Sequence, residues 1–150
     1  MQTDLAQLPV ERETHKIGAG TREWVVFSDD LAPFRSRQMF VLGVSEAVLG
    51  FEFATQGWRY GQILACCGGR GEVLVNGKWV ECAAGDAYLT PALTPHHYRA
   101  VSRDPWQLVW ITYEPPHEST PLLDVRAATL TKVDPKPLYH LVMGLFYAQL

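Results

Sequence analysis

Long apolar runs are missing from this 150-residue chain, and none approaches the length that a helix needs to cross a bilayer. The N-terminus has early acidic residues and no apolar signal core, so we expect a cytoplasmic protein with no membrane partner. Runs of Lys or Arg are also missing, and the net charge is −3. Because nucleic-acid binding needs clustered positive charge, this segment alone is not expected to bind DNA.

Cysteine is scarce, and its pattern excludes two classes of small protein. Cys66, Cys67 and Cys82 are odd in number, and two of them are adjacent. Neighbouring strand residues point to opposite faces, so the set predicts neither a disulfide framework nor a metal knuckle. We expect reduced, buried thiols. No GxSxG motif occurs either, so the sequence gives no support for nucleophilic catalysis.

Short strand-forming segments separated by Gly, Pro, Asn and Asp are abundant between residues 61 and 113. Asn76-Gly77, between two apolar segments, predicts a two-residue type I′ hairpin turn. That turn pairs Glu72 with Glu81, and the cost of burying charge places both carboxylates in water. With 47% hydrophobic and 19% charged residues, the chain has the composition of one soluble domain, a small barrel or sandwich.

Further strands are expected at residues 24–27, 39–45, 48–53 and 96–101. The segment 106–113 alternates between two largely apolar faces. We therefore expect one face in a packed core and the other lining a cavity.

The C-terminal segment has the period of a helix instead. Asp134-Pro135 has the features of a helix start. Apolar residues then recur at i, i+3, i+4, i+7 and i+8, and a second apolar stripe runs beside them. Such a helix needs covering on two sides, one by the barrel and the other by a partner chain or another domain. The first stripe is Leu138, Leu141, Val142, Leu145 and Phe146; the second is Tyr139, Met143, Tyr147 and Leu150.

Four motifs carry a resemblance to a known family: GRGEVLVNG, AAGDAYLTP, TPHHYRA and WQLVWITY. Together they resemble the cupin ligand-sensing domain of AraC-type transcriptional regulators. The resemblance implies a mainly β cupin barrel, a double-stranded β-helix or jelly roll, with a C-terminal α-helix. It also implies the effector-binding barrel at 21–115 and a linker and dimerisation helix at 116–150. Residues 1–20 are polar and weakly patterned, so we expect a flexible arm there. DNA would be bound by a helix-turn-helix domain beyond residue 150.

The arabinose-sensing member of that family implies candidate contacts for a small-molecule effector. Tyr98 and Trp110 match its sugar-contacting Tyr and stacking Trp, and Ser45 roughly matches a hydroxyl residue. Leu108 stands where that member has an inward His, and Arg59 lies near the place of its sugar-gripping Arg. These departures favour another sugar, a glycoside or a non-sugar effector. The full candidate set is Trp110, Tyr98, His96, Leu108, Arg59 and Ser45, with the stripe that begins at Leu138 as the homodimer contact.

Metal binding is a property of many cupins, but the ligand pattern is incomplete here. The first-motif positions fall near Gln56, Trp58 and Gln62, and none is His or Glu. His96 remains, and a single imidazole does not hold a transition metal. We therefore expect no metal, no cofactor and no enzymatic activity. Two alternatives stay open: a metal-dependent cupin enzyme, such as a sugar isomerase or dioxygenase, and a barrel without a ligand.

Overall fold

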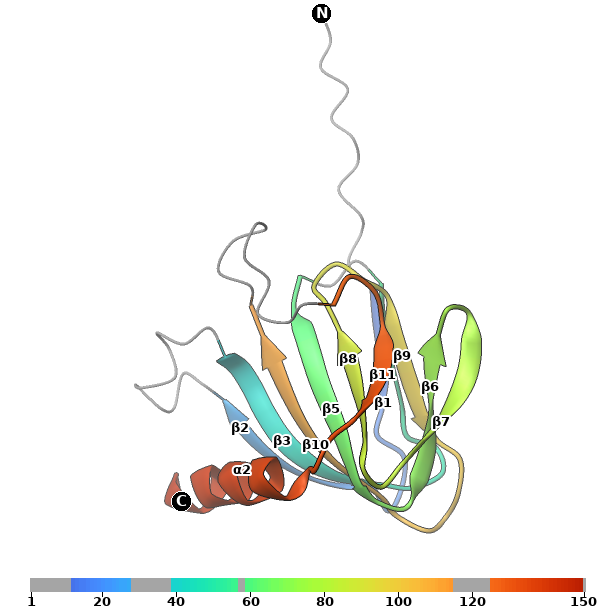
Figure 1. Ribbon diagram of the computed structural model, residues 1–150. Helices are drawn as coiled ribbons and strands as arrows, with labels where there is room; N and C mark the ends of the chain where they lie inside the picture. Colours follow the sequence, from blue (N-terminus) through green and yellow to red (C-terminus); the bar gives the residue numbers. More distant parts are fainter. Residues whose placement is uncertain (1–11, 28–38, 57–58, 115–124, 150) are drawn as a thin grey trace, which may run out of the picture.

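The fold is seen in a computed structural model that describes residues 12–27, 39–56, 59–114 and 125–149. Two antiparallel sheets face each other, and one helix lies against the outside of the larger sheet (Figure 1). The elements are β1 (Arg12–Lys16), β2 (Arg22–Phe27), β3 (Met39–Ala47), β4 (Glu52–Gln56), β5 (Gly61–Gly68), β6 (Arg70–Val75), β7 (Lys78–Ala83), β8 (Asp86–Thr90), β9 (His96–Ala100), β10 (Trp106–Tyr113), β11 (Thr129–Lys132) and α2 (Lys136–Ala148). The strand order is β1-β4-β9-β6-β7 in one sheet and β11-β8-β5-β10-β3-β2 in the other.

The β6–β7 hairpin has the predicted register, with Glu72 opposite Glu81. Asn76 and Gly77 have φ values of 52° and 75°, as a type I′ turn requires. Glu72 pairs with Arg99 at 3.1 Å, and the Glu81 side chain is 61% exposed. The two carboxylates therefore lie on the outer, solvated face of the sheet, as predicted.

One sequence prediction in the N-terminal half needs correction. The strand expected at 48–53 begins only at Glu52, because the chain turns at Leu49 and Gly50, whose φ is 104°. The arm expected at 1–20 contains β1, which pairs with β4 and places His15 opposite Phe53. Backbone hydrogen bonds of a sheet edge thus hold part of the arm, while residues 1–11 lie outside the described part of the chain.

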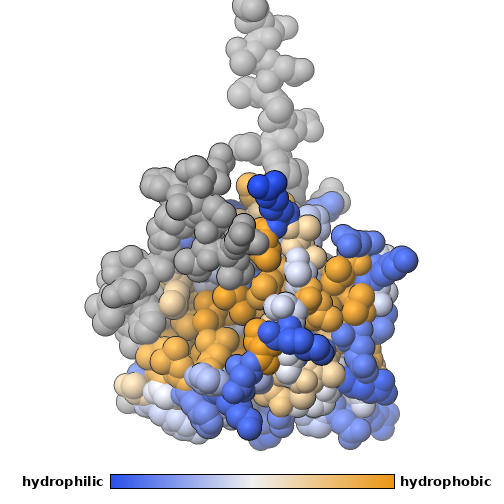
Figure 2. Space-filling view, in the orientation of Figure 1, coloured by the Kyte–Doolittle hydropathy of each residue, from blue (hydrophilic) through white to orange (hydrophobic). Residues whose placement is uncertain are grey.

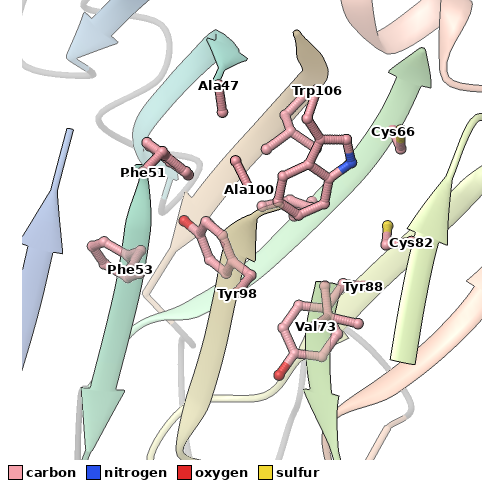
Figure 3. Packing of buried hydrophobic residues seen from close by; sticks show 12 residues of the cluster. Ala47, Phe51, Phe53, Cys66, Val73, Cys82, Tyr88, Tyr98, Ala100 and Trp106 are labelled. Carbon is pink, nitrogen blue, oxygen red and sulfur yellow. The ribbon is translucent and has the colours of Figure 1, made fainter. Parts of the chain in front are cut away.

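The core lies between the sheets, on the inward face of β10. Trp106 is fully buried there (Figure 3). Leu108 is fully buried as well, and the same face continues to Trp110, which is only partly buried. The outward residues Val109 and Ile111 are buried as well, in a second cluster beneath α2. Neither face of β10 is wet, as predicted. The core and the cavity share the inward face, however, because the opposite face is covered by the helix.

The helix α2 begins where the Asp134-Pro135 signal predicted, and Asp134 Oδ1 accepts a hydrogen bond from the Lys136 N–H at 3.1 Å. Val142 is fully buried against the sheet, and Leu138 packs beside it. No helix in the described ranges is long and apolar enough to cross a membrane.

The outer side of α2 remains apolar in part. Leu141 is 53% exposed and Tyr147 is 63% exposed, whereas Leu145 and Phe146 are half-buried. Apolar side chains also gather over this face of the molecule, bordered by hydrophilic ones (Figure 2). The helix thus uses both predicted stripes on its own sheet, through Leu138, Tyr139, Val142 and Met143, and still presents apolar surface to its surroundings.

Candidate ligand-binding site

A cavity of about 480 Å³ lies between the two sheets and has the size of a site for a small metabolite. Its walls come from both sheets, and most of its lining is aromatic or aliphatic. Polar groups enter it at a few positions only. The described lining residues are His15, Glu23, Val25, Phe27, Phe40, Val41, Phe51, Phe53, Tyr60, Gln62, Tyr98, Trp110 and Thr112.

Trp110 forms part of the cavity wall on β10, directly opposite Gly43 of β3. A β-carbon added at Gly43 would overlap the indole ring, so the glycine leaves room for the ring to lie over β3. The indole Nε1–H donates a hydrogen bond to Ser45 Oγ at 2.9 Å. The position of the ring is therefore allowed by the missing side chain at Gly43 and fixed by the hydrogen bond to Ser45.

Ser45 connects Trp110 to a carboxylate that the sequence reasoning missed. Its hydroxyl donates to Glu23 Oε2 at 2.7 Å, and Ser45 and Glu23 are cross-strand partners in the β2–β3 pair. Ser45 itself is fully buried and supports the cavity wall from behind. On the other side of the carboxylate, His15 Nε2 lies 3.8 Å from Glu23 Oε1. Trp110, Ser45 and Glu23 thus form a hydrogen-bonded chain that ends at the cavity.

Tyr98 lines the cavity from the opposite sheet and is 4% exposed. Its ring lies over Phe53 with a centroid distance of 5.3 Å, and Figure 3 shows it between the phenylalanines and Trp106. Gln62 Nε2 donates a hydrogen bond to the Tyr98 hydroxyl at 3.3 Å. Gln62 Oε1 is buried without a hydrogen-bond partner among the described residues. Tyr98 on β9 and Gln62 on β5 thus meet between the two sheets and form a polar position within an apolar surface.

His96 points inward, as predicted, but it lies outside the lining of this cavity. Its imidazole is hydrogen-bonded to Thr55 Oγ1, at 3.0 Å from Nδ1. Burial lowers the pKa of His96 to about 4, because the charged form loses its hydration. The neighbouring His97 points outward and pairs with Glu52 at 2.5 Å. Both histidines border a separate depression of about 310 Å³.

Arg59 and Leu108 are also placed outside the cavity lining. The Arg59 guanidinium donates to the Tyr60 hydroxyl at 2.6 Å and lies 4.9 Å from the centre of that ring. Tyr60 lines the cavity, so Arg59 contacts a lining residue without being part of the lining. Leu108 is fully buried in the core cluster. Of the six sequence-predicted contacts, the structure brings Trp110 and Tyr98 into the lining and puts Ser45 directly behind it.

The alternation of side chains along β2 was a sequence signal for Glu23. Glu23, Val25 and Phe27 alternate along β2, and all three line the cavity. An acidic residue in phase with two inward apolar residues is the pattern of a carboxylate carried into an apolar site. His15 had no comparable signal, because β1 lacks apolar alternation.

The fold belongs with the cupins. The cupin domain of an XRE-family transcriptional regulator from Enterobacter cloacae is similar, with a TM-score of 0.50 and 15% identity, covering 63% of this chain and 97% of that chain. A predicted oxalate decarboxylase from Thermotoga maritima has a TM-score of 0.53 and 13% identity, covering 71% and 91%. A putative glyoxylate-induced protein from Pseudomonas aeruginosa has a TM-score of 0.57 and 13% identity, covering 83% of this chain and 45% of that one.

The family follows from the sequence match. The model of the AraC-like ligand-binding domain matches residues 47–146, so the chain belongs to that family. The resemblance seen in the four motifs is thereby confirmed. A search of curated proteins returned no match.

The donor groups between the sheets do not fit a metal ion. In the part of the chain that the structure describes, no three His, Cys, Asp or Glu side chains gather as a metal site. The inward His96 is hydrogen-bonded to Thr55. Gln62, near one of the ligand positions that the resemblance implies, hydrogen-bonds Tyr98. The cavity lining itself offers one imidazole and one carboxylate, those of His15 and Glu23, whereas transition metals in proteins require three or more ligands.

Proposed function

We propose that this domain is the effector-sensing and dimerisation part of a cytoplasmic transcriptional regulator. A small molecule, a sugar or a related metabolite, binds inside the metal-free barrel without being chemically changed. DNA is contacted through a separate helix-turn-helix domain beyond residue 150. The observation that carries the proposal is the aromatic cavity in a chain of the AraC-like ligand-binding family.

The placement of the cavity supports a sensing role. A ligand between the sheets contacts Trp110 on one sheet and Tyr98 on the other, so its binding free energy depends on how the two sheets are arranged. The β1 strand also reaches the cavity through His15. An effector shifts a conformational equilibrium only through different affinities for the two states. A site built from both sheets and from the first strand offers such a difference.

Replacing Trp110 with alanine is expected to weaken effector binding about tenfold or more, which corresponds to about 1.4 kcal/mol. The indole offers a large flat face to the guest, and alanine removes it. Binding is measured by calorimetry with the compound that gives the largest thermal shift in a panel of sugars, aryl glycosides and aromatic amines.

The matched control is Trp79→Ala, because Trp79 is half-buried on the outer face and stacks on Arg99. Its affinity should equal that of the unaltered protein. Unchanged affinity in folded Trp110→Ala protein would remove Trp110 from the site.

The homodimer is proposed to form through α2, with Leu141 as the most exposed residue of the predicted set. Leu141→Glu should shift the sedimentation equilibrium from dimer to monomer, because it places a charge in an apolar contact. The same substitution at Leu49, which is 55% exposed in a turn, serves as the control. A monomer at all concentrations in the unaltered protein would contradict the proposal.

An enzymatic role is disfavoured by the donor groups between the sheets. The similar fold of a predicted oxalate decarboxylase shows shared architecture at 13% identity, and no more than that. Stoichiometric iron, manganese or zinc in protein purified without a chelator would overturn the proposed sensor role in favour of a metal-dependent cupin enzyme.

A further inference from the structure

The cavity contains a carboxylate whose charge the surrounding side chains do not balance well. Glu23 is the only acidic residue among the described lining residues, and its side chain is 15% exposed. The same set contains no Lys or Arg, and His15 is its only basic residue. His15 Nε2 lies 3.8 Å from Glu23 Oε1, which is beyond hydrogen-bond distance, and the imidazole carries charge only when protonated. Enclosing a carboxylate without a cation is unfavourable.

The carboxylate is held in place before any ligand arrives. Glu23 Oε2 accepts the Ser45 hydroxyl at 2.7 Å, and Ser45 Oγ in turn accepts the Trp110 indole N–H at 2.9 Å. Ser45 is fully buried, so solvent does not compete for its hydroxyl. A carboxylate only accepts hydrogen bonds. Oε1 is therefore left as an oriented acceptor that a donor on the ligand can reach.

The arginines near Glu23 and Tyr60 in sequence bind other partners than Glu23. Arg22, next to Glu23 in β2, pairs with Glu46 at 2.6 Å on the other face of the strand. Arg59 donates a hydrogen bond to the hydroxyl of Tyr60. Among the described residues, Arg22 thus has a carboxylate partner of its own, and Arg59 has a hydroxyl partner.

Aromatic rings line the same cavity as this carboxylate. Phe40 and Tyr60 stack with a centroid distance of 4.6 Å, and Phe53 stacks on Tyr98 at 5.3 Å. Ring faces carry negative electrostatic potential and attract cations, most strongly where water is excluded. The full set of rings in the described lining is Phe27, Phe40, Phe51, Phe53, Tyr60, Tyr98 and Trp110.

We propose that the effector is an organic ammonium compound with a flat apolar body. This inference rests on the proposed sensing role of the cavity, and it replaces the sugar named there with an organic ammonium class. The ammonium N–H donates to Glu23 Oε1 and balances its charge, while the body lies against Trp110 and the phenylalanines. A neutral polyol donates to the carboxylate as well, but it leaves the charge unbalanced and places several hydroxyl groups against apolar rings.

Two matched probe pairs test this class. Tryptamine is compared with tryptophol, and 2-phenylethylamine with 2-phenylethanol, because each pair differs only in an ammonium or a hydroxyl group. Calorimetry at neutral pH should show the amine binding about tenfold to a hundredfold more tightly than the alcohol, in the range of hydrogen bonds to charged groups. Glu23→Gln should abolish that preference and leave the affinity for the alcohol within a few-fold.

Glu46→Gln is the matched control, because Glu46 lies on the outer face and pairs with Arg22. It should keep the full preference for the amine. Circular dichroism and thermal melting verify that Glu23→Gln is folded. If it is not, Ser45→Ala, which removes the hydroxyl that orients the carboxylate, should reduce the preference.

The outcomes separate this inference from the proposed function. Equal binding of amine and alcohol, with both weakened by Trp110→Ala, overturns the ammonium class and leaves the sensing cavity intact. No binding of any of the four probes at millimolar concentration also overturns it, and the wider ligand panel then tests the proposed function separately. A preference for the amine that persists in Glu23→Gln excludes Glu23 as its cause.

Discussion

Replacing Trp106 with alanine is expected to lower the free energy of unfolding by about 3–5 kcal/mol, the largest effect of any single substitution considered for this domain. Trp106 is fully buried and belongs to the cluster that packs the two sheets together. Its ring meets Tyr98 edge-on with a centroid distance of 6.4 Å. A β-carbon at Gly71 would overlap the indole, so β6 approaches β10 closely at this point. Alanine would leave a cavity that rigid strands on both sides do not fill.

Chemical denaturation measures this loss directly, and Trp106→Phe is the informative control. The indole Nε1 of Trp106 is buried without a hydrogen-bond partner among the described residues. Phenylalanine therefore removes no such bond and keeps most of the volume, and we expect a loss of less than about 2 kcal/mol. A loss below about 1 kcal/mol for Trp106→Ala would mean that this end of the barrel repacks freely.

Features that depend on contacts between residues close in sequence were predicted well from the sequence. The β6–β7 hairpin follows from two residues, because Asn76-Gly77 fixes the turn and the turn fixes every pair from Val75–Lys78 outward. The strand Trp106–Tyr113 was predicted with its observed bounds, since its alternation is uninterrupted. Such features depend on neighbours in sequence, and local chemistry determines them.

The cavity depends on distant neighbours, and here the prediction was incomplete. Ser45 meets Trp110 across 65 residues and Glu23 across 22. Sequence reasoning found Trp110, Tyr98 and Ser45 through the resemblance, but it missed Glu23. The alternation of Glu23, Val25 and Phe27 gives their common face, but it does not show which sheet β2 joins. His96 was correctly placed inward, yet its partner Thr55 lies on β4, 41 residues away. The face of the sheet to which a side chain points follows from the local sequence, whereas its contact partner depends on the order of the strands.

Acidification from pH 7 to pH 4 is expected to cost about 3 kcal/mol of stability through His96 alone. Burial holds the pKa of His96 at about 4 in the folded protein, against an ordinary value of 6.5. Between these two values the unfolded chain binds a proton that the folded protein does not bind, so the free energy of unfolding falls as the pH falls. Above pH 6.5 both states are neutral at this position, and below pH 4 both are charged. The loss is therefore confined to that window.

Substitution by glutamine separates this effect from the other titrating groups. In His96→Gln, an uncharged amide replaces the imidazole beside Thr55, so the slope of unfolding free energy against pH should flatten between pH 6.5 and 4 relative to the unaltered protein. The ring resonances of His96, followed by NMR, should stay unchanged from pH 7 to pH 5. An imidazole that titrates near pH 6.5, or a slope equal in both proteins, would show that His96 is hydrated. Phe53 stacks on both His96 and Tyr98, and Phe53 and Tyr98 line the cavity. Hydration at His96 would therefore also indicate that water reaches this part of the cavity wall from the side of His96.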